Sequence, residues 1–488
     1  MRKAGTLIHI SSLPNKYGIG SFGKSAYEFV DFLCKSNQSI WQILPLGPTS
    51  FGDSPYQTFS SFAINPYFID LDQLINEGLL LEEDIKSELT NNELIDYSFL
   101  FKNRLAVLYL AFKNFIPNKN FHYFLEKNKF WTEDYSLFMA LKEKFEYKPF
   151  NLWDKEFKFR DEKIIKNEKE KLNDRIDFHL FLQFKAYEQW YKLKSYANEN
   201  GVEIIGDMPI YVAYDSTDVW MHNNFFQLNS NLDMINVAGV PPDGFSEEGQ
   251  LWGNPLYNWD ALKKENYSYM IKRIQHNLEI YDYLRIDHFV GFEHYYSIPF
   301  GKLNAKVGEW IKGPSKDFFH VLRKKISTLK IIAEDLGRKS QGVLDLLEFT
   351  NFPGMNITQH LIGTYDHNTE LIFDFKENSV SYTGTHDNET TLQWYENLSN
   401  KDKVNIRKYL GVIKKKEICN ALIHETLKSK SKIVVIPIQD YLEQNSRSRM
   451  NEPGTTGNNW RYRTFSYNFS SELAERIKKL IFSTMRES

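Results

Sequence analysis

The stretch VEIIGD at residues 202–207 is a short apolar run that ends in a glycine and an acid. Seven other apolar runs end in polar, glycine or proline residues, and helical periodicity follows them. Runs of this kind are typical of strands buried on both faces of a parallel sheet. Eight such strands alternating with helices predict an α/β fold, a (β/α)8 TIM barrel with inserted, mainly helical subdomains. The eight predicted strands are residues 6–9, 40–44, 202–206, 283–286, 330–333, 354–358, 380–383 and 432–438.

The long gap between the second and third strands predicts an insertion. We assign residues 1–70 and 181–488 to the catalytic barrel and residues 71–180 to an inserted helical subdomain. Residues 154–175 are dense in Lys, Glu and Asp, which indicates a solvated helix or a mobile linker. Two stretches place apolar residues at helical spacing: Phe101, Leu105, Leu108 and Phe112 in the first, and Leu180, Phe184, Tyr187 and Tyr191 in the second.

A second, smaller insertion is predicted at residues 212–280, between the third and fourth strands. It contains a stretch at residues 237–255 with four glycines and three prolines. That composition argues against a regular helix or strand and predicts a long irregular loop. Long loops on barrels are usually functional or disordered, and the aromatic residues within this one argue against disorder.

Composition restricts the class of protein. Hydrophobic residues make up 42% and charged residues 25% of 488 residues, which is typical of a globular chain. A net charge of −3 gives no basic surface for nucleic acid or acidic lipid. The chain has no apolar run long enough for a signal peptide or a membrane span, so we expect a cytoplasmic protein. Cys34 and Cys419 suit a reducing compartment and the role of small buried hydrophobic residues.

Acids stand at the ends of four predicted strands. Asp207, Asp287, Glu334 and Asp387 each follow an apolar run or its short extension. Active sites of barrels are built from residues at these strand ends, so the four carboxylates are expected to share one rim. Carboxylates gathered in this way raise one another's pKa, which is costly unless function requires it.

Two of these acids have different surroundings. Arg285 and Asp287 are two residues apart on a strand, so their side chains point to the same side, and the guanidinium would hold Asp287 ionised. A purely structural ion pair remains an alternative for these two residues. Glu334 follows an apolar run beside other acids, which would raise its pKa and suit a general acid. An ionised carboxylate and a protonated one are what cleavage of a glycosidic bond needs.

The same side chains could also bind a metal ion or a sugar. Asp207, Asp287, Glu334, Asp387, His288 and His386 are all competent metal ligands, but no metal-binding spacing occurs, and Arg285 would oppose a cation. We expect no metal and no cofactor, since no calcium loop or nucleotide fingerprint is present. His288 and His386 could instead hydrogen-bond sugar hydroxyls. Aromatic residues near strand ends could stack on sugar rings: Tyr56, Trp252 and Phe289.

Several blocks of the sequence resemble those of a known enzyme group. LRIDHF at 284–289, AEDLG at 333–337 and THDN at 385–388 are similar to blocks of the amylase-like glycosidases. More narrowly, the chain resembles the 4-alpha-glucanotransferases, which include the amylomaltases or disproportionating enzymes. That likeness rests on SSLP at 11–14, GDSPY at 52–56, GDMPIYV at 206–212, the stretch 239–255, FPGM at 352–355 and NEPGTTGNNWR at 451–461.

The resemblance implies a retaining transfer of α-1,4-glucan segments to glucose or a maltooligosaccharide. It implies that Asp287 is the nucleophile, Glu334 the acid/base and Asp387 the stabiliser of the transition state. It places Tyr56, Asp207, Arg285, His288 and His386 around the attacked glucose, and Asp243, Gln250 and Trp252 in a lid formed by residues 237–255. Two alternatives stay open at this point: an α-glucan hydrolase with the same site, and a glucan-binding protein without activity.

Overall fold

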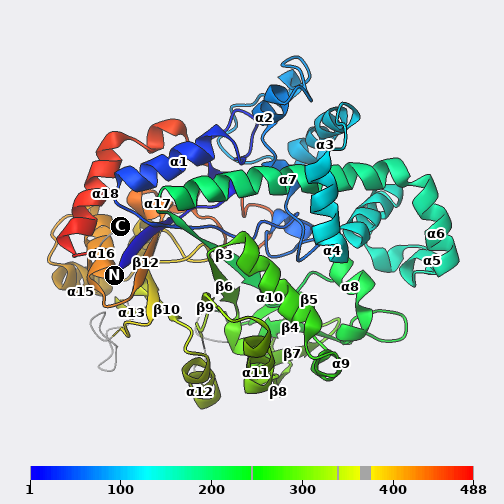
Figure 1. The fold of residues 1–488 in the computed structure, drawn as a ribbon. Helices are drawn as coiled ribbons and strands as arrows, with labels where there is room; N and C mark the ends of the chain where they lie inside the picture. The colour runs from blue at the N-terminus through cyan, green and yellow to red at the C-terminus, as the bar shows by residue number, and fades with distance from the viewer. Residues whose placement is uncertain (1, 243–245, 338–339, 363–374, 487–488) are drawn as a thin grey trace.

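The eight predicted strands form one parallel sheet that curves into a nearly closed barrel in the computed structural model (Figure 1). The structure describes residues 2–486 apart from 243–245, 338–339 and 363–374. The strand order is β10-β11-β12-β1-β2-β3-β6-β9, and the two end strands also contact each other. The predicted TIM barrel is therefore confirmed. Its strands are β1 (Lys3–Leu7), β2 (Ile40–Gln42), β3 (Glu203–Pro209), β6 (Tyr283–Asp287), β9 (Ile331–Ala333), β10 (Gly354–Ile357), β11 (Ser379–Tyr382) and β12 (Ile433–Pro437).

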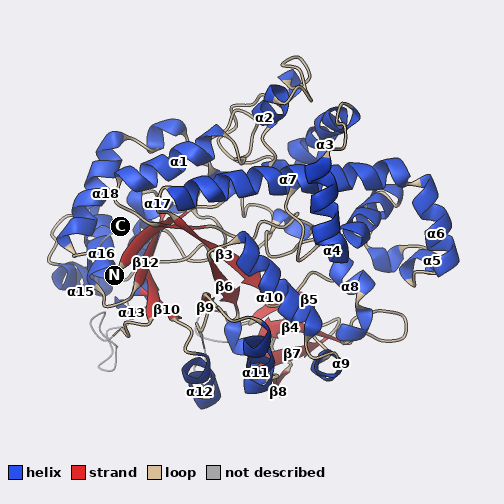
Figure 2. Ribbon diagram, viewed as in Figure 1, coloured by secondary structure: helices blue, strands red, loops and turns tan. Residues whose placement is uncertain are grey.

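The barrel strands are buried on both faces, which explains why their sequences do not alternate. All five residues of β12 are buried, and Val434, Val435 and Ile436 are fully inaccessible. Gly5 in β1 lets the neighbouring strand come close, because a Cβ there would lie 2.3 Å from the carbonyl oxygen of Ile40. Figure 2 shows the helices arranged around this sheet.

The helices follow the strands in the order that a (β/α)8 fold requires, with several extra helices in the long connections. The described helices are α1 (Lys24–Lys35), α2 (Leu71–Asn76), α3 (Tyr97–Lys113), α4 (Lys119–Lys144), α5 (Lys155–Lys158), α6 (Glu162–Lys171), α7 (Asn173–Glu199), α8 (Thr217–Met221), α9 (Trp259–Lys264), α10 (Ser268–Ile280), α11 (Ser315–Lys325), α12 (Gln341–Thr350), α13 (Thr358–Ile362), α14 (Thr391–Asn397), α15 (Asn400–Leu410), α16 (Ile418–Lys428), α17 (Ile438–Tyr441) and α18 (Ser471–Ser483).

The connection between β2 and β3 is helical, as predicted. It carries α2 to α7, and the long helices α4 and α7 pack against each other (Figure 1). The charged stretch 154–175 contains the two short, largely exposed helices α5 and α6. The predicted boundary at residue 180 lies inside α7, which continues from the insertion to contact α1 and β3. The division of the chain into domains stays a prediction.

One predicted helix face is wrong. In α3 the buried residues are Leu100, Arg104, Val107, Leu108 and Ala111, whereas Phe101 is 49% exposed. The reason is a buried ion pair, because Arg104 Nε donates to Glu88 Oε2 at 2.7 Å. A count of apolar residues alone could not place an arginine on the inner face. In α7, by contrast, Phe184 and Tyr187 are buried as predicted.

The prediction of a wholly irregular stretch at 237–255 is also wrong. Its two ends are antiparallel strands, β4 (Asn236–Val240) and β5 (Gln250–Pro255). They join β7 (His294–Pro299) and β8 (Glu309–Lys312) in a four-stranded sheet of order β5-β4-β7-β8. Gly239 lies at a register shift in β4, where a Cβ would come within 2.2 Å of Gln250 O. This glycine therefore permits close strand pairing and does not mark an irregular loop.

The structure also places the two cysteines and tests for membrane-spanning helices. Cys419 in α16 is buried, as expected, but Cys34 in α1 is exposed, so its predicted role as a buried hydrophobic residue is wrong. None of the described helices is both long and apolar enough to cross a bilayer.

Candidate active site

Three of the predicted acids meet at the ends of adjacent strands. Asp207 lies in β3, Asp287 ends β6 and Glu334 directly follows β9. The ladder between β3 and β6 pairs Asp207 with Arg285, and that between β6 and β9 pairs Arg285 with Ile332. The sheet register therefore sets these side chains beside one another before any side-chain contact is considered.

Arg285 joins two of the carboxylates. Its Nη1 donates to Asp207 Oδ2 at 2.6 Å and its Nη2 to Asp287 Oδ1 at 3.0 Å. Burial opposes the charge of this guanidinium, but the adjacent Asp207 and Asp287 raise the pKa of Arg285 well above its usual value. The Asp287 side chain stays 30% exposed, whereas Asp207 is inaccessible. Asp287 is thus a fixed carboxylate with a free side open to an incoming molecule.

Glu334 is held in a different environment. Its Oε2 accepts a hydrogen bond from the backbone N–H of His288 at 2.7 Å, and its Oε1 accepts one from Leu336 at 2.8 Å. Burial, with a contribution from the negative charge of Asp287, raises the pKa of Glu334 to about 7, against the opposing effects of Arg285 and the two N–H donors. At neutral pH this carboxyl can therefore both give and take a proton.

Two buried polar atoms at this rim have no hydrogen-bond partner among the described residues: Asp207 Oδ1 and His288 Nε2. His288 adopts a left-handed backbone with φ of 51° directly after β6. Burial lowers the pKa of His288 to about 4, so its ring is neutral at physiological pH. An unpaired buried acceptor and an unpaired ring nitrogen are suited to hydroxyl groups of a bound ligand.

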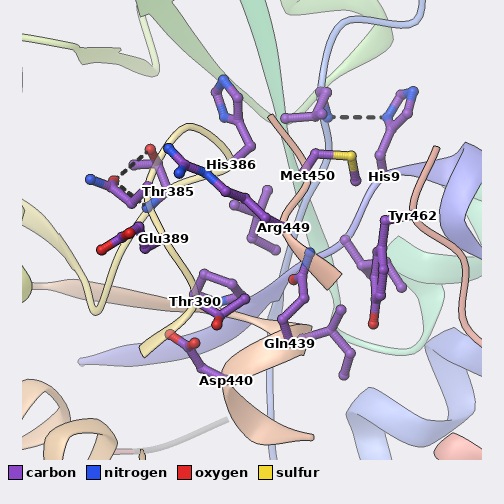
Figure 3. A pocket seen from close by; sticks show the side chains of 16 residues that line it. His9, Thr385, His386, Glu389, Thr390, Gln439, Asp440, Arg449, Met450 and Tyr462 are labelled. Carbon is purple, nitrogen blue, oxygen red and sulfur yellow. Dashed lines mark hydrogen bonds between the residues drawn. The ribbon is translucent and has the colours of Figure 1, made fainter. Parts of the chain in front are cut away.

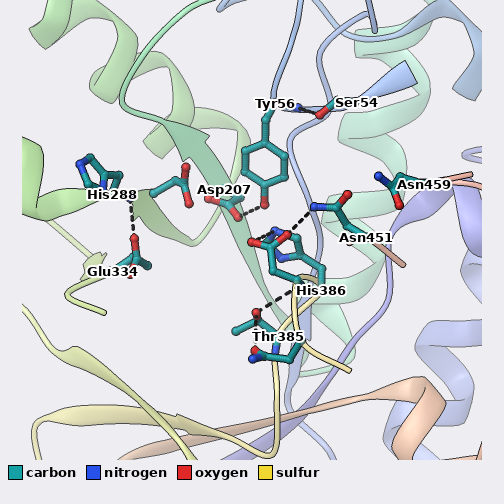
Figure 4. Close-up of polar contacts among 12 residues, drawn as sticks. Ser54, Tyr56, Asp207, His288, Glu334, Thr385, His386, Asn451 and Asn459 are labelled. Atoms are coloured by element: carbon teal, nitrogen blue, oxygen red, sulfur yellow. Dashed lines mark hydrogen bonds and ion pairs between the residues drawn. The ribbon is translucent and has the colours of Figure 1, made fainter. Parts of the chain in front are cut away.

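The fourth acid, Asp387, comes from the loop between β11 and α14. Its Oδ1 accepts from Asn451 Nδ2 at 2.6 Å, and its Oδ2 lies 3.3 Å from His386 Nε2 (Figure 4). Desolvation favours the neutral acid, but the charge and hydrogen bond of His386 and the hydrogen bond of Asn451 lower the pKa of Asp387 to about 2. In turn, Asp387 raises the pKa of His386 against the effect of burial.

Aromatic rings close one side of the site. The Tyr56 hydroxyl donates to Asp207 Oδ2 at 2.7 Å, and its ring stacks on His386 with centroids 5.1 Å apart (Figure 4). Trp460 packs against both rings, at 5.7 Å from Tyr56 and 5.9 Å from His386. Tyr56 therefore links the strand that carries Asp207 to the loop that carries Asp387.

The chain was compared with known proteins on this basis. The family model described as 4-alpha-glucanotransferase, glycoside hydrolase 77, matches residues 8–467. The chain belongs to the 4-alpha-glucanotransferase family. The predicted enzyme class is confirmed, and the matched residues include the helical connection between β2 and β3 as well as the barrel.

Individual relatives agree with this assignment. The chain is 45% identical over 480 residues to a 4-alpha-glucanotransferase of Clostridium butyricum, covering 97% of this chain and 98% of the relative. A 4-alpha-glucanotransferase of Streptococcus pneumoniae serotype 4 is 43% identical over 95% of this chain and 93% of its own. The structure of an amylomaltase from Streptococcus agalactiae in complex with acarbose superposes with a TM-score of 0.97 at 39% identity, with full coverage of both chains.

Residues of the predicted lid reach this 4-alpha-glucanotransferase site in part. Trp252 in β5 packs edge-on against the His288 ring, with centroids 4.8 Å apart. Gln250 accepts a hydrogen bond from Trp252 Nε1 at 3.1 Å, so it supports the tryptophan. Asp243, the third predicted lid residue, lies outside the described residues.

One predicted sugar-binding residue lies elsewhere. Phe289 is fully buried and packs against Phe292, Phe319 and Phe352, so it belongs to the core. His288 leaves β6 in a left-handed conformation, and Phe289 begins a short 3-10 helix whose four residues are all buried. In the part of the chain that the structure describes, no group of three or more His, Cys, Asp or Glu side chains is arranged to hold a metal ion.

Analysis of the sequence did not single out two residues of the site, Asn451 and Trp460. Both lie in the stretch 451–461, which comes after the last predicted strand, residues 432–438, and not at its end. Trp460 is only 7% exposed and has a φ of 66°, unusual for a bulky side chain and typical of positions that the surrounding structure enforces. The one available signal was the block NEPGTTGNNWR, whose composition of glycine, asparagine and a single tryptophan indicates a structured loop.

Proposed function

We propose that this protein transfers a segment of an α-1,4-glucan to the 4-OH of glucose or a maltooligosaccharide by double displacement, through a covalent intermediate on Asp287. The observation that carries the proposal is the contrast between two adjacent carboxylates. Asp287 is paired with Arg285 and open on one side, whereas burial raises the pKa of Glu334 to about 7. Retaining glycosidases need one carboxylate of each kind.

In the first step, an Asp287 oxygen attacks the anomeric carbon while the glycosidic C–O bond breaks. Glu334 gives its proton to the departing oxygen, so the leaving chain acquires a new 4-OH. Because Arg285 is anchored at its other end by Asp207, it can keep the Asp287 carboxylate oriented until the bond forms. The product is a glucosyl ester on Asp287 and an ionised Glu334.

In the second step, Glu334 takes the proton from the 4-OH of an acceptor sugar. The resulting oxygen attacks the anomeric carbon and releases Asp287 as a carboxylate, which restores the enzyme and the α-configuration. Asp387, ionised at neutral pH, would accept hydrogen bonds from sugar hydroxyls as positive charge develops on the ring. Asp207 Oδ1, His288 Nε2 and His386 would bind further hydroxyls of the same glucose, and Tyr56 would stack on its ring.

Transfer instead of hydrolysis requires that a sugar hydroxyl reaches the intermediate before water does. Trp252, Gln250 and Asp243 belong to the stretch 237–255, which we propose covers the bound chain as a lid. The contact of Trp252 with the His288 ring supports this placement, because it brings the β4–β5 hairpin to the edge of the site.

Incubation with maltotriose tests the proposal. Transfer predicts a ladder of longer maltooligosaccharides and released glucose, with a constant number of reducing ends. A steady increase in reducing ends without longer products would show an α-glucan hydrolase instead. Intact maltotriose after prolonged incubation, together with measurable binding, would show a glucan-binding protein without turnover. The Asp287→Asn variant is the matched control for background hydrolysis.

A further inference from the structure

The loop that carries His386 and Asp387 is not part of a strand or a long helix. It connects β11 (Ser379–Tyr382) to α14 (Thr391–Asn397). A pocket lies beside it, and its lining includes His386, Thr385, Thr390, Gln439 and Asp440 (Figure 3). The cavity within it is small, with a volume of about 20 Å³. Hydrogen bonds at both ends of the loop help to fix its position beside this pocket.

Asp440 supplies such hydrogen bonds at the base of the loop. Its Oδ2 accepts from Thr383 Oγ1 at 2.5 Å and from Thr391 Oγ1 at 2.8 Å, and its Oδ1 accepts from the Thr391 backbone N–H at 2.7 Å. Thr383 directly follows β11, and Thr391 is the first residue of α14. One side chain, which extends from the helix after β12, therefore connects both ends of the loop.

The chemistry of this contact requires a carboxylate. Asp440 is 1% exposed, and among the described residues no Lys, Arg or His forms an ion pair with it. A buried carboxylate without a cation is costly, and its hydrogen-bond donors must offset that cost. Three donors converge on it, which an ionised carboxylate can accept at once. An asparagine offers a single acceptor oxygen and would turn its NH2 group towards a donor.

We propose that Asp440 is a positioning residue of the transfer reaction, which fixes the loop between β11 and α14 and thereby sets the position of Asp387 at the active site. The inference rests on the role proposed for Asp387. The loop is held at its top by Asn451, whose N–H donates to His386 O at 3.1 Å, and by Arg449 Nη2, which donates to Asp387 O at 2.9 Å. Asp440 fixes the two ends of the loop, where it leaves β11 and where it enters α14.

The test compares Asp440→Asn with Asp70→Asn. Asp70 is also a buried carboxylate that forms no ion pair with any described residue, and it accepts from Ser21 Oγ and from the N–H of Gln73 at the start of α2. Both variants are expected to lower the melting temperature. In assays well below those melting temperatures, kcat should fall about 10- to 100-fold in Asp440→Asn with KM nearly unchanged, because a small displacement of a group acting in the transition state has effects of that size. Asp70→Asn should retain wild-type kcat.

Variants of Thr391 keep the test decisive if Asp440→Asn does not fold. Thr391→Ser retains both donors and should behave as wild type, whereas Thr391→Val loses the hydroxyl and should show a smaller fall in kcat. Equal kcat for Thr391→Val and wild type, or equal losses for Asp440→Asn and Asp70→Asn, would overturn the proposal.

A double variant separates this proposal from the proposed function. If Asp440 acts through Asp387, adding Asp440→Asn to Asp387→Asn should cause almost no further loss of kcat. Full multiplication of the two losses would contradict the positioning role. If Asp387→Asn alone keeps wild-type turnover, the role proposed for Asp387 is wrong and the inference fails with it.

Discussion

The two sides of the active site are held by different means. Asp207, Arg285 and Asp287 lie on adjacent barrel strands, and Glu334 follows the next strand along the sheet. Their positions follow from the strand register and from the hydrogen bonds of Arg285. His386 and Asp387, in contrast, lie in a loop, which hydrogen bonds to residues 440, 449 and 451 hold in place.

The two sides of the site hold residues with different proposed roles. The strand-held side contains the groups proposed to make and break bonds, where small displacements have the largest effect on rate. The loop-held side contains groups proposed to bind sugar hydroxyls and to stabilise charge. Substitutions on the first side should therefore abolish turnover, while those on the second should reduce it and leave the chemistry in place.

The largest effect is expected for Asp287→Asn. The amide has nearly the same shape but no charge with which to attack the anomeric carbon, so kcat should fall on the order of 10⁴-fold or more. Arg285 keeps its contact with Asp207, so the fold should remain and calorimetry should still detect maltooligosaccharide binding. Asp345→Asn on α12 is the matched control and should be fully active. The Asp345 carboxylate accepts a hydrogen bond from Gln341 on the same helix. Turnover by the Asp287→Asn variant would exclude Asp287 as the nucleophile.

Glu334→Gln is expected to have the next largest effect, about 10²- to 10⁴-fold on kcat. In the wild type, the rate should decline as pH rises through about 7, because the carboxyl loses the proton that the leaving oxygen needs. The glutamine variant should lack this alkaline limb.

A maltosyl fluoride donor sharpens the test of Glu334, since fluoride departs without a proton. Formation of the intermediate from this donor should be nearly normal in Glu334→Gln. An unchanged alkaline limb, or equal losses for both donors, would assign the acid role to another group.

Asn451→Ala tests the loop-held side. The variant removes the donor 2.6 Å from Asp387 Oδ1, which stabilises the ionised form. The pKa of Asp387 should therefore rise from about 2 towards the ordinary range, and the acid limb of the rate profile should move to higher pH. Loss of a charged hydrogen bond should lower kcat about 10- to 100-fold. Asn378→Ala, just before the start of β11 and bonded to Asn351, should change neither quantity.

The smallest effect on total turnover is expected for Trp252→Ala. Removing the ring that packs on His288 should admit water, so the ratio of hydrolysis to transfer should increase several-fold. Product analysis with maltotriose gives both rates at once. Leu251→Ala, a neighbouring and more exposed residue of β5, serves as the control. If both variants keep the wild-type ratio, the hairpin does not exclude water.

Much of the strand-held side could be predicted from the sequence. Apolar runs ending in an acid identified β3, β6 and β9, and the spacing of Arg285 and Asp287 predicted their contact. These predictions succeed because strand geometry is periodic and because parallel strands bring their ends to one rim. Asn451 and Trp460 were missed because their contacts depend on how a loop returns to the barrel, which local periodicity does not describe.

The errors have a common origin in tertiary contacts. The sequence interpretation of Phe289 and Phe101 rests on residue type, yet Phe289 packs in the core against Phe319 and Phe352. The inward-facing Arg104, paired with Glu88, leaves Phe101 exposed. The glycines of the stretch 237–255 were taken as breakers, but Gly239 allows two strands to approach. In each case a neighbour distant in the sequence decided the outcome.

The sequence by itself determined the barrel and three acids at its strand ends, because buried parallel strands and their termini leave a pattern that can be recognised locally. Only the tertiary structure decided that burial gives Glu334 a pKa near 7, that Asn451 pairs with Asp387, and that Asp440 bonds both ends of the loop between β11 and α14. Desolvation and hydrogen bonding depend on atoms from many parts of the chain, which meet only when it folds.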